Sequence, residues 1–125
     1  MMIKKLVASA LCAALGFGLS GCFTASVEQG TPTPVENISV TLAPGRTLAG
    51  AITAAASRRR WLPQAQANGT IRCTLSQREH LVVVDVVPNG ERAFSIRFVQ
   101  SNIPVRKYDQ WVNNLSREIV YQASL

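Results

Sequence analysis

The sequence predicts an α+β domain in which an antiparallel meander of about four strands carries two helices packed on one face. Two observations lead to this fold class. Four short segments between residues 61 and 99 resemble strands and are joined by turn residues. Stretches with helical spacing flank them, an alanine-rich one at 47–60 and an amphipathic one at 107–125. An alternating sheet face and an apolar helix stripe each need a partner, so packing one on the other is the economical architecture.

The first helix begins after Thr47, which stands where an N-cap is needed. Leu48, Ile52 and Ala55 fall on one stripe at helical spacing, and alanine, the best helix former, is abundant. The run Arg58–Arg60 lies in the last turn, where cations interact favourably with the negative end of the helix dipole. Helix termination therefore explains the arginine run, and an anion-binding role is the alternative.

Four strand segments follow, at residues 61–67, 70–75, 80–87 and 93–99. Pro63 cannot donate a hydrogen bond to a neighbouring strand, so it confines the first segment to a sheet edge or a bulge. Asn68-Gly69 predicts a tight hairpin turn. The third segment is β-branched and apolar on both faces, and it is the strongest strand of the four.

Loop lengths set the strand register, because side chains alternate with a period of two. A three-residue loop at 88–90, with Pro first and Gly in the left-handed position, gives the facing pairs Val84–Phe94, Val82–Ile96 and His80–Phe98. A four-residue loop at 76–79 gives the pairs Cys73–Val82 and Leu75–His80. The buried face of the sheet would then consist of Ile71, Cys73, Leu75, Val82, Val84, Phe94, Ile96 and Phe98.

The second helix is predicted in the final segment, after a polar loop. Its apolar residues recur at positions 108, 111, 112, 115 and 119, with polar residues between them. This spacing places Tyr108, Trp111, Val112, Leu115 and Ile119 on one face of a helix, which is expected to pack against the sheet.

Residues 1–21 match a bacterial lipoprotein signal peptide. A positive start with Lys4 and Lys5 precedes a 13-residue apolar run, which is too short to span a membrane. The run leads into Leu19-Ser20-Gly21-Cys22, the pattern that lipoprotein-processing enzymes recognise. Cleavage between Gly21 and Cys22 would leave Cys22 as the acylated first residue, and two or more acyl chains anchor a protein stably. The alternative is an ordinary secretory signal with a chance cysteine.

The mature chain divides into a tether, residues 22–37, and a single α+β domain, residues 38–125. The tether is rich in Thr, Pro, Ser and Gly, and a flexible segment of this length spans about 20 Å. Alternation at residues 38–42 predicts a short strand or an extended arm leading into the domain. Phe23 follows the acylated cysteine where an Asp would signal inner-membrane retention, so the expected location is the periplasmic face of the outer membrane.

The composition of the mature chain limits its partners. Loss of Lys4 and Lys5 with the signal leaves 11 basic and 7 acidic side chains, a formal net charge of +4. The anions that a basic chain encounters in the cell envelope are phospholipid or lipopolysaccharide head groups. We therefore expect no nucleic-acid partner. A solvated basic surface without a specific partner is the alternative. Beside Cys22 only Cys73 remains, so no internal disulfide forms and the fold depends on apolar burial.

The sheet face turned away from the helices is the candidate binding face. It would carry Thr70, Arg72, Thr74, Leu81, Val83, Asp85, Ser95, Arg97 and Val99. Leu81 and Val83 are too apolar for open solvent, so a cover is expected: Trp61, the N-terminal arm, a second copy of the chain or another envelope protein. Arg72 lies diagonal to Asp85 on the neighbouring strand, which predicts a cross-strand ion pair. The residues assigned to the candidate binding site are Arg72, Leu81, Val83, Asp85 and Arg97.

Catalytic chemistry has little support in the sequence. His80 and Cys73 could form a thiol–imidazole pair, but a Cys on an apolar strand face is usually an inert small hydrophobe. His80 at a strand start more often packs or caps. No second His or Cys stands at the spacing of metal ligands. We therefore expect no catalytic residue, no metal site and no cofactor.

From Ala51 to Leu115 the chain resembles a group of small, uncharacterised lipoproteins of Gram-negative bacteria. The residues that carry the likeness are Ala51-Ile52, Arg59, Trp61, Gly69-Thr70-Ile71, Thr74-Leu75, Arg78, His80, Val84-Asp85-Val86, Phe94-Ser95-Ile96-Arg97-Phe98, Ser101, Tyr108, Trp111-Val112 and Leu115. These lipoproteins usually have Gly-Trp after the first helix, whereas Arg60 stands at the glycine position here. The resemblance implies an envelope lipoprotein domain of unknown function and transfers no site.

The sequence thus favours a lipid-anchored, non-enzymatic envelope protein whose outer sheet face contacts another envelope component. A second copy of the chain is a further candidate partner. The alternative function is a small-molecule or glycan-binding periplasmic domain with a pocket near Trp61, Arg78 and His80. A flat outer face favours a macromolecular partner, whereas a concave pocket of roughly 300 Å³ or more favours a ligand.

Overall fold

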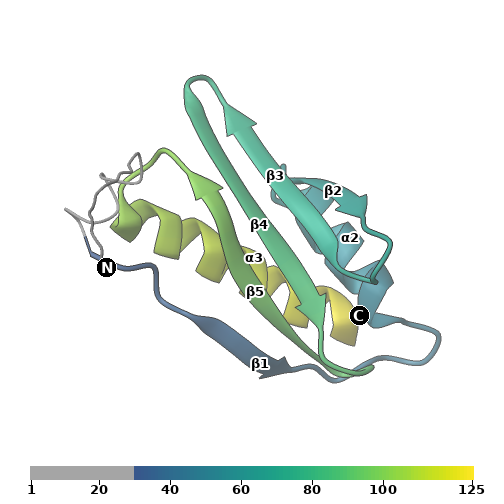
Figure 1. Ribbon diagram of the computed structural model, residues 1–125. Coiled ribbons are helices and arrows are strands. Elements are labelled where there is room, and N and C mark those ends of the chain that lie inside the picture. The colour runs from purple at the N-terminus through teal and green to yellow at the C-terminus, as the bar shows by residue number, and fades with distance from the viewer. Residues whose placement is uncertain (1–29) are drawn as a thin grey trace, which may run out of the picture. The chain divides into compact units, whose positions relative to one another are not determined.

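A computed structural model describes residues 30–125 of the chain. The predicted signal peptide, the cleavage site at Gly21 and the acylated Cys22 lie outside the described residues. The α+β class is confirmed, with a sheet on one side and two helices on the other (Figure 1). The elements are β1 (Val35–Ser39), α2 (Leu48–Arg58), β2 (Leu62–Ala65), β3 (Ile71–Gln77), β4 (His80–Pro88), β5 (Ala93–Ser101) and α3 (Val105–Ser124).

The antiparallel sheet has five strands instead of the predicted four, in the order β1-β5-β4-β3-β2. The additional strand is β1, which pairs Val35 with Ile96 and Ile38 with Phe94. A bulge between Val35 and Ile38 interrupts the alternation, and Asn37 takes a φ of 55° there, so the sequence pattern of this strand is weak. The expected flexible tether therefore ends before Val35. Strand β2 with Pro63 forms the opposite edge, as predicted.

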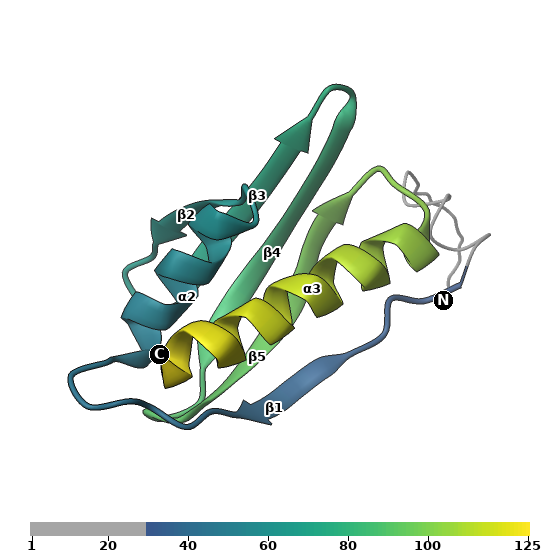
Figure 2. The ribbon, with the colours of Figure 1, turned by 180° about the vertical axis from the view of Figure 1, so that it is seen from behind.

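Both helices lie on the same face of the sheet (Figure 2). Thr47 caps α2, because its Oγ1 accepts a hydrogen bond from the Gly50 N–H at 3.1 Å. On α3 the predicted stripe is buried at Tyr108 and Leu115, among others, but Trp111 is only half-buried. The Trp111 ring stands edge-on to His80, with 6.2 Å between ring centroids.

Arg60 ends α2 in a conformation that normally favours glycine, with a φ of 69°. The Trp61 N–H donates to the Ala56 carbonyl at 2.7 Å, and the Arg60 N–H donates to the Ser57 carbonyl at 3.1 Å. These two bonds are those of a Schellman motif, in which a left-handed residue satisfies the last carbonyls of a helix. The chain then turns so that Trp61 enters the core, where it is 3% exposed.

The predicted register of β3 against β4 is shifted by two residues. Arg78 and Glu79 form a two-residue turn in place of the expected four-residue loop at 76–79, and Arg78 has a φ of 57°. The pairs are therefore Gln77–His80, Leu75–Val82 and Cys73–Val84. A shift of two residues keeps each side chain on its predicted face, because the alternation has a period of two.

Between the turn and a bulge at Val83/Val84, the predicted register of β4 against β5 is shifted by four residues, and beyond the bulge Val82 faces Ser101, a shift of five. The connecting loop runs over 89–92 instead of 88–90, and Pro88 stays in the strand opposite Phe94. The observed pairs Val86–Ile96 and Val84–Phe98 replace the expected Val82–Ile96, Val84–Phe94 and His80–Phe98. An even shift again preserves the faces.

The core fills the space between the sheet and the helices. Seven of the eight residues predicted for the buried sheet face are 0–6% exposed, and Val86 joins them. Phe98 is the exception, at 43% exposed. It packs one side of its ring edge-on against Tyr108, 5.4 Å between centroids, and leaves the rest in solvent next to the bulge of β5. From the helices the core receives Leu48, Ala51, Ile52, Ala55, Ala56, Tyr108, Val112, Leu115, Ile119 and Ala123.

Candidate functional site

The outer face of the sheet, opposite the helices, is left uncovered by the elements described (Figures 1 and 2). Trp61, expected as a cover, is buried on the helix side. The N-terminal arm does not cover the face either, because it forms β1 at the sheet edge. Val40, which follows β1, is 7% exposed and belongs to the core. Within residues 30–125, both intramolecular covers proposed from the sequence are therefore wrong.

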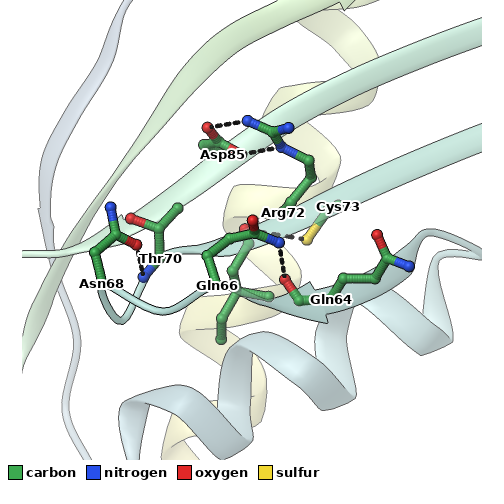
Figure 3. A network of polar contacts seen from close by, with 8 residues as sticks. Gln64, Gln66, Asn68, Thr70, Arg72, Cys73 and Asp85 are labelled. Atoms are coloured by element: carbon green, nitrogen blue, oxygen red, sulfur yellow. Dashed lines mark hydrogen bonds and ion pairs between the residues drawn. The ribbon is translucent and has the colours of Figure 1, made fainter.

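The charged centre of this face is the pair Arg72–Asp85. The two residues are directly opposite across β3 and β4, where the sequence predicted a diagonal arrangement. The guanidinium donates to both carboxylate oxygens, from Nε to Oδ1 at 2.8 Å and from Nη2 to Oδ2 at 3.0 Å (Figure 3). The hydrogen bond and the negative charge of Asp85 raise the pKa of Arg72 above its usual value. The pair is thus a fixed, mutually neutralised part of the sheet.

Arg97 occupies the other side of Asp85, directly opposite it on β5. Its side chain is exposed, and it forms no ion pair within residues 30–125. Because Asp85 is already held by two nitrogens of Arg72, Arg97 is the cation on this face that lacks an ion-pair partner among the described residues.

Apolar side chains lie beside these charges. Leu81 and Val83 are half-buried, and Val99 is 38% exposed. Val83 is opposite Gln100 and Val84 is opposite Phe98, so Val99 is the extra residue of a β-bulge. The outer face therefore combines an apolar patch with an arginine that has no ion-pair partner between residues 30 and 125.

A hollow of about 380 Å³ opens on the same face, next to the β2–β3 hairpin. Around it, the Asn68 Oδ1 accepts from the Thr70 N–H at 3.1 Å, and the Gln66 side-chain amide donates to the Gln64 carbonyl at 3.1 Å (Figure 3). The residues lining the hollow are Gln66, Ala67, Asn68, Thr70, Arg72, Asp85, Val87 and Arg97.

The pocket predicted near Trp61, Arg78 and His80 is not formed as expected. A cavity of about 170 Å³ touches Trp61, and neither Arg78 nor His80 lines it. Its volume is below the range of roughly 300 Å³ and more that is usual for ligand pockets. The cavity is instead bounded by Trp61, Trp111, Arg59, Leu75, Gln77 and Asn114.

Cys73 and His80 are not brought together. Cys73 is fully buried opposite Val84, whereas His80 lies at the end of β4 opposite Gln77 and packs on Trp111. Burial first, and then the charge of Asp85, raise the pKa of the Cys73 thiol to about 12. The thiol therefore stays protonated at neutral pH and is a poor nucleophile.

The structure also contains contacts that sequence reasoning missed. Glu118 on α3 is 7% exposed, and its Oε1 accepts from the Arg59 Nε at 3.2 Å. The Arg58 Nε lies 3.7 Å from the other carboxylate oxygen. Two arginines of the run at the end of α2 thus meet a buried acid, and this contact exists only because α2 packs on α3. The sequence offered one hint, an acidic residue next to the apolar stripe of α3.

A groove of about 580 Å³ between β1 and α3 was equally unforeseen. At its edge, the Asp109 carboxylate accepts from the N–H and the hydroxyl of Thr33, at 2.9 and 2.7 Å. The sequence did not indicate this groove, because its composition predicted a flexible tether at the position of Thr33.

Metal-ligating residues do not cluster in the described part of the chain: no three His, Cys, Asp or Glu side chains lie close enough to share an ion. Among residues 30–125 there is also no helix with the length and hydropathy to cross a bilayer. No family model, curated protein or solved structure matches this chain.

Proposed function

We propose that this protein is a lipid-anchored binding module of the bacterial envelope, which presents the outer face of its sheet to a protein partner. The anchor is the acylated Cys22 of the predicted signal, at the periplasmic face of the outer membrane. This assignment also agrees with the resemblance to small Gram-negative lipoproteins. The observation that supports binding is a sheet face that neither helix covers. On it, Leu81, Val83 and Val99 lie with Arg97, which forms no ion pair within the part of the chain that the structure describes.

The composition of this face favours a protein over a small ligand. Protein interfaces combine an apolar centre with a polar rim, and arginine is enriched in them. A partner that fits would place apolar side chains over the patch and an acidic side chain against Arg97. The Arg72–Asp85 pair needs no external partner, because its charges already satisfy one another.

A binding role without catalysis is supported by the state of the nucleophile. Cys73 is buried and its pKa is raised to about 12, and His80 is held against Trp111 away from it. A thiolate next to a base is what cysteine nucleophiles require.

Site-specific photo-crosslinking in cells tests the proposal. A photoreactive residue at Leu81 should give one discrete protein adduct, and the same residue at Tyr121, exposed on α3, should not give it. Arg97→Glu should abolish the adduct, whereas Arg92→Glu, the same charge change in the β4–β5 loop, should leave it intact. An adduct with the mass of two chains would instead identify a second copy as the occupant.

Two results contradict the proposal. One is the absence of any discrete adduct from Leu81, and the other is an adduct that survives Arg97→Glu. Comparing the lipidated protein with Cys22→Ser in solubilised membranes separates recognition from location. If both forms give the same adduct, the domain itself carries recognition.

The hollow of about 380 Å³ favours a second candidate function, the binding of a small polar ligand such as a glycan fragment. Its amide side chains and Arg97 can hydrogen-bond hydroxyl or carboxylate groups. Ligand-detected NMR with peptidoglycan and lipopolysaccharide sugars tests this candidate. It predicts loss of signal with Arg97→Glu and no loss with Arg92→Glu.

A further inference from the structure

The net positive charge of the described domain lies in its helical layer and not in its sheet. The strands and the turns between them are balanced, with four arginines (Arg72, Arg78, Arg92, Arg97) against four acids (Glu36, Glu79, Asp85, Glu91). The helices, their C-terminal cap and the preceding loop carry seven cations (Arg46, Arg58, Arg59, Arg60, Arg106, Lys107, Arg117) against two acids (Asp109, Glu118). The excess is therefore confined to one side of the domain.

Both acids of this layer are occupied by internal partners. Asp109 accepts two hydrogen bonds from Thr33, at 2.9 and 2.7 Å. Glu118 is buried and accepts from Arg59 at 3.2 Å and from the Gln122 amide at 2.9 Å. Arg59 neutralises Glu118, whereas Asp109 keeps its negative charge because Thr33 donates only neutral hydrogen bonds. The three cations of α3 therefore remain in excess over its one uncompensated acid.

The exposed side of α3 forms a continuous stripe without an acid. At 3.6 residues per turn, Arg106, Gln110, Asn113, Arg117 and Tyr121 follow one another along the helix, and all are exposed. Lys107 flanks the stripe, with its Nζ 6.0 Å from the centroid of the Trp111 ring. Cations interleaved with amphipathic aromatic rings suit the headgroup region of a membrane, where such rings are enriched.

The chain also enters the domain beside this helix. Thr33 is hydrogen-bonded to Asp109 in the first half of α3, which places the start of the described unit against the helical layer. The first residues of the domain are thus held against the helical layer.

We propose that the helical layer, centred on the exposed stripe of α3, docks on an anionic phospholipid surface and turns the outer sheet face away from the membrane. The orientation rests on the anchor of the proposed function, but docking itself depends only on the cations of α3. Each Lys or Arg near an anionic membrane contributes about 1 kcal/mol to attraction, so the three cations of α3 together contribute on the order of a 100-fold preference.

The test measures binding of the full chain to two kinds of vesicle, phosphatidylcholine alone and phosphatidylcholine mixed with phosphatidylglycerol. The ratio of the affinity for anionic vesicles to the affinity for neutral vesicles measures the charge-dependent part of binding. The contribution of the N-terminal segment, which carries Lys4 and Lys5, is the same in every variant and cancels when variants are compared. The variant Arg106→Gln/Lys107→Gln/Arg117→Gln should lower this ratio roughly 100-fold. The matched control Arg78→Gln/Arg92→Gln/Arg97→Gln removes the same charge from exposed positions of the sheet layer and should lower it less than about ten-fold.

Increasing salt gives a second measurement that needs no variant, since it should remove the preference of the unmodified chain for anionic vesicles. The proposal is overturned if the unmodified chain shows no such preference, or if both triple variants lose it equally. Either failure leaves the crosslinking result at Leu81 unaffected, because the outer sheet face shares no residue with the stripe. The docking proposal and the proposed function can therefore fail separately.

Discussion

Arg60 shows how one backbone dihedral directs the path of the chain. Its left-handed conformation closes the Schellman motif and turns Trp61 into the core. A residue with a Cβ atom is strained in this region of φ/ψ space, and the cost is on the order of 1–2 kcal/mol. The surrounding packing and the two hydrogen bonds offset that cost.

Arg60→Gly should therefore stabilise the domain by about 1 kcal/mol, because glycine adopts a positive φ without strain. Chemical denaturation monitored by circular dichroism measures the free energy of unfolding. Arg60→Ala is the matched control, since it removes the same charge but keeps the Cβ atom. If the alanine variant gains as much stability as the glycine variant, relief of backbone strain is not the cause.

At the residue scale, the sequence predicted the sheet face on which a side chain lies more accurately than the residue opposite it on the neighbouring strand. Cys73, Val82 and Val84 are buried as predicted, although none has its predicted partner. The face of a side chain depends only on the two-residue alternation along the strand, and this alternation can be seen in the sequence. Facing pairs depend on loop length, and the turn at Arg78 lacks the glycine that marks a two-residue loop. The burial predicted for Phe98 was wrong for a different reason, because the side chain lies next to the bulge of β5 and contacts Tyr108 with only one side of its ring.

Among the elements, α2, β4 and β5 begin at the residues that the sequence predicted. Thr47 is the predicted N-cap and its side chain makes the capping bond. The first strand was located less closely, because the sequence predicted a short strand or an extended arm at residues 38–42, whereas β1 covers Val35–Ser39. The bulge at Asn37 removes its alternation, and its partner β5 is remote in sequence.

Thr47→Ala should destabilise the domain by about 1 kcal/mol, because an N–H of the first turn of α2 loses its acceptor. Thr53→Ala, on the exposed side of the same helix, is the matched control and should be neutral or slightly stabilising, since alanine has the higher helix propensity. Thermal unfolding of both variants distinguishes capping from a general effect of removing a threonine. Equal losses in the two variants would count against a specific role of the cap.

At the scale of the whole molecule, two layers divide the chemistry between them. The helices bury one sheet face and carry the net positive charge, while the other face holds the apolar patch and Arg97. The membership of this outer face was predicted from alternation. The exposure of this face was not predicted, because it depends on where the loops and the first strand run in space.

Adjacent residues of β4 test this division into layers. Val83→Lys places a charge on the outer face and should leave the domain folded. Val84→Lys buries an unpaired charge at a position that is 0% exposed and should unfold it. Circular dichroism and one-dimensional NMR report the outcome. Two folded proteins, or two unfolded ones, would contradict the assignment of the faces.

The pairing of β1 with β5 has a consequence for the order of folding. Asn37 and Ser95, which are hydrogen-bonded across these strands, are 58 residues apart in the sequence, whereas β2, β3, β4 and β5 are joined by short hairpins. Loop-closure entropy delays the long-range contact until the hairpins have formed. Because a chain is synthesised from its N-terminal end, β1 stays an unpaired strand until β5 has also been made, and the protein is most open to mispairing and to chaperones during this interval.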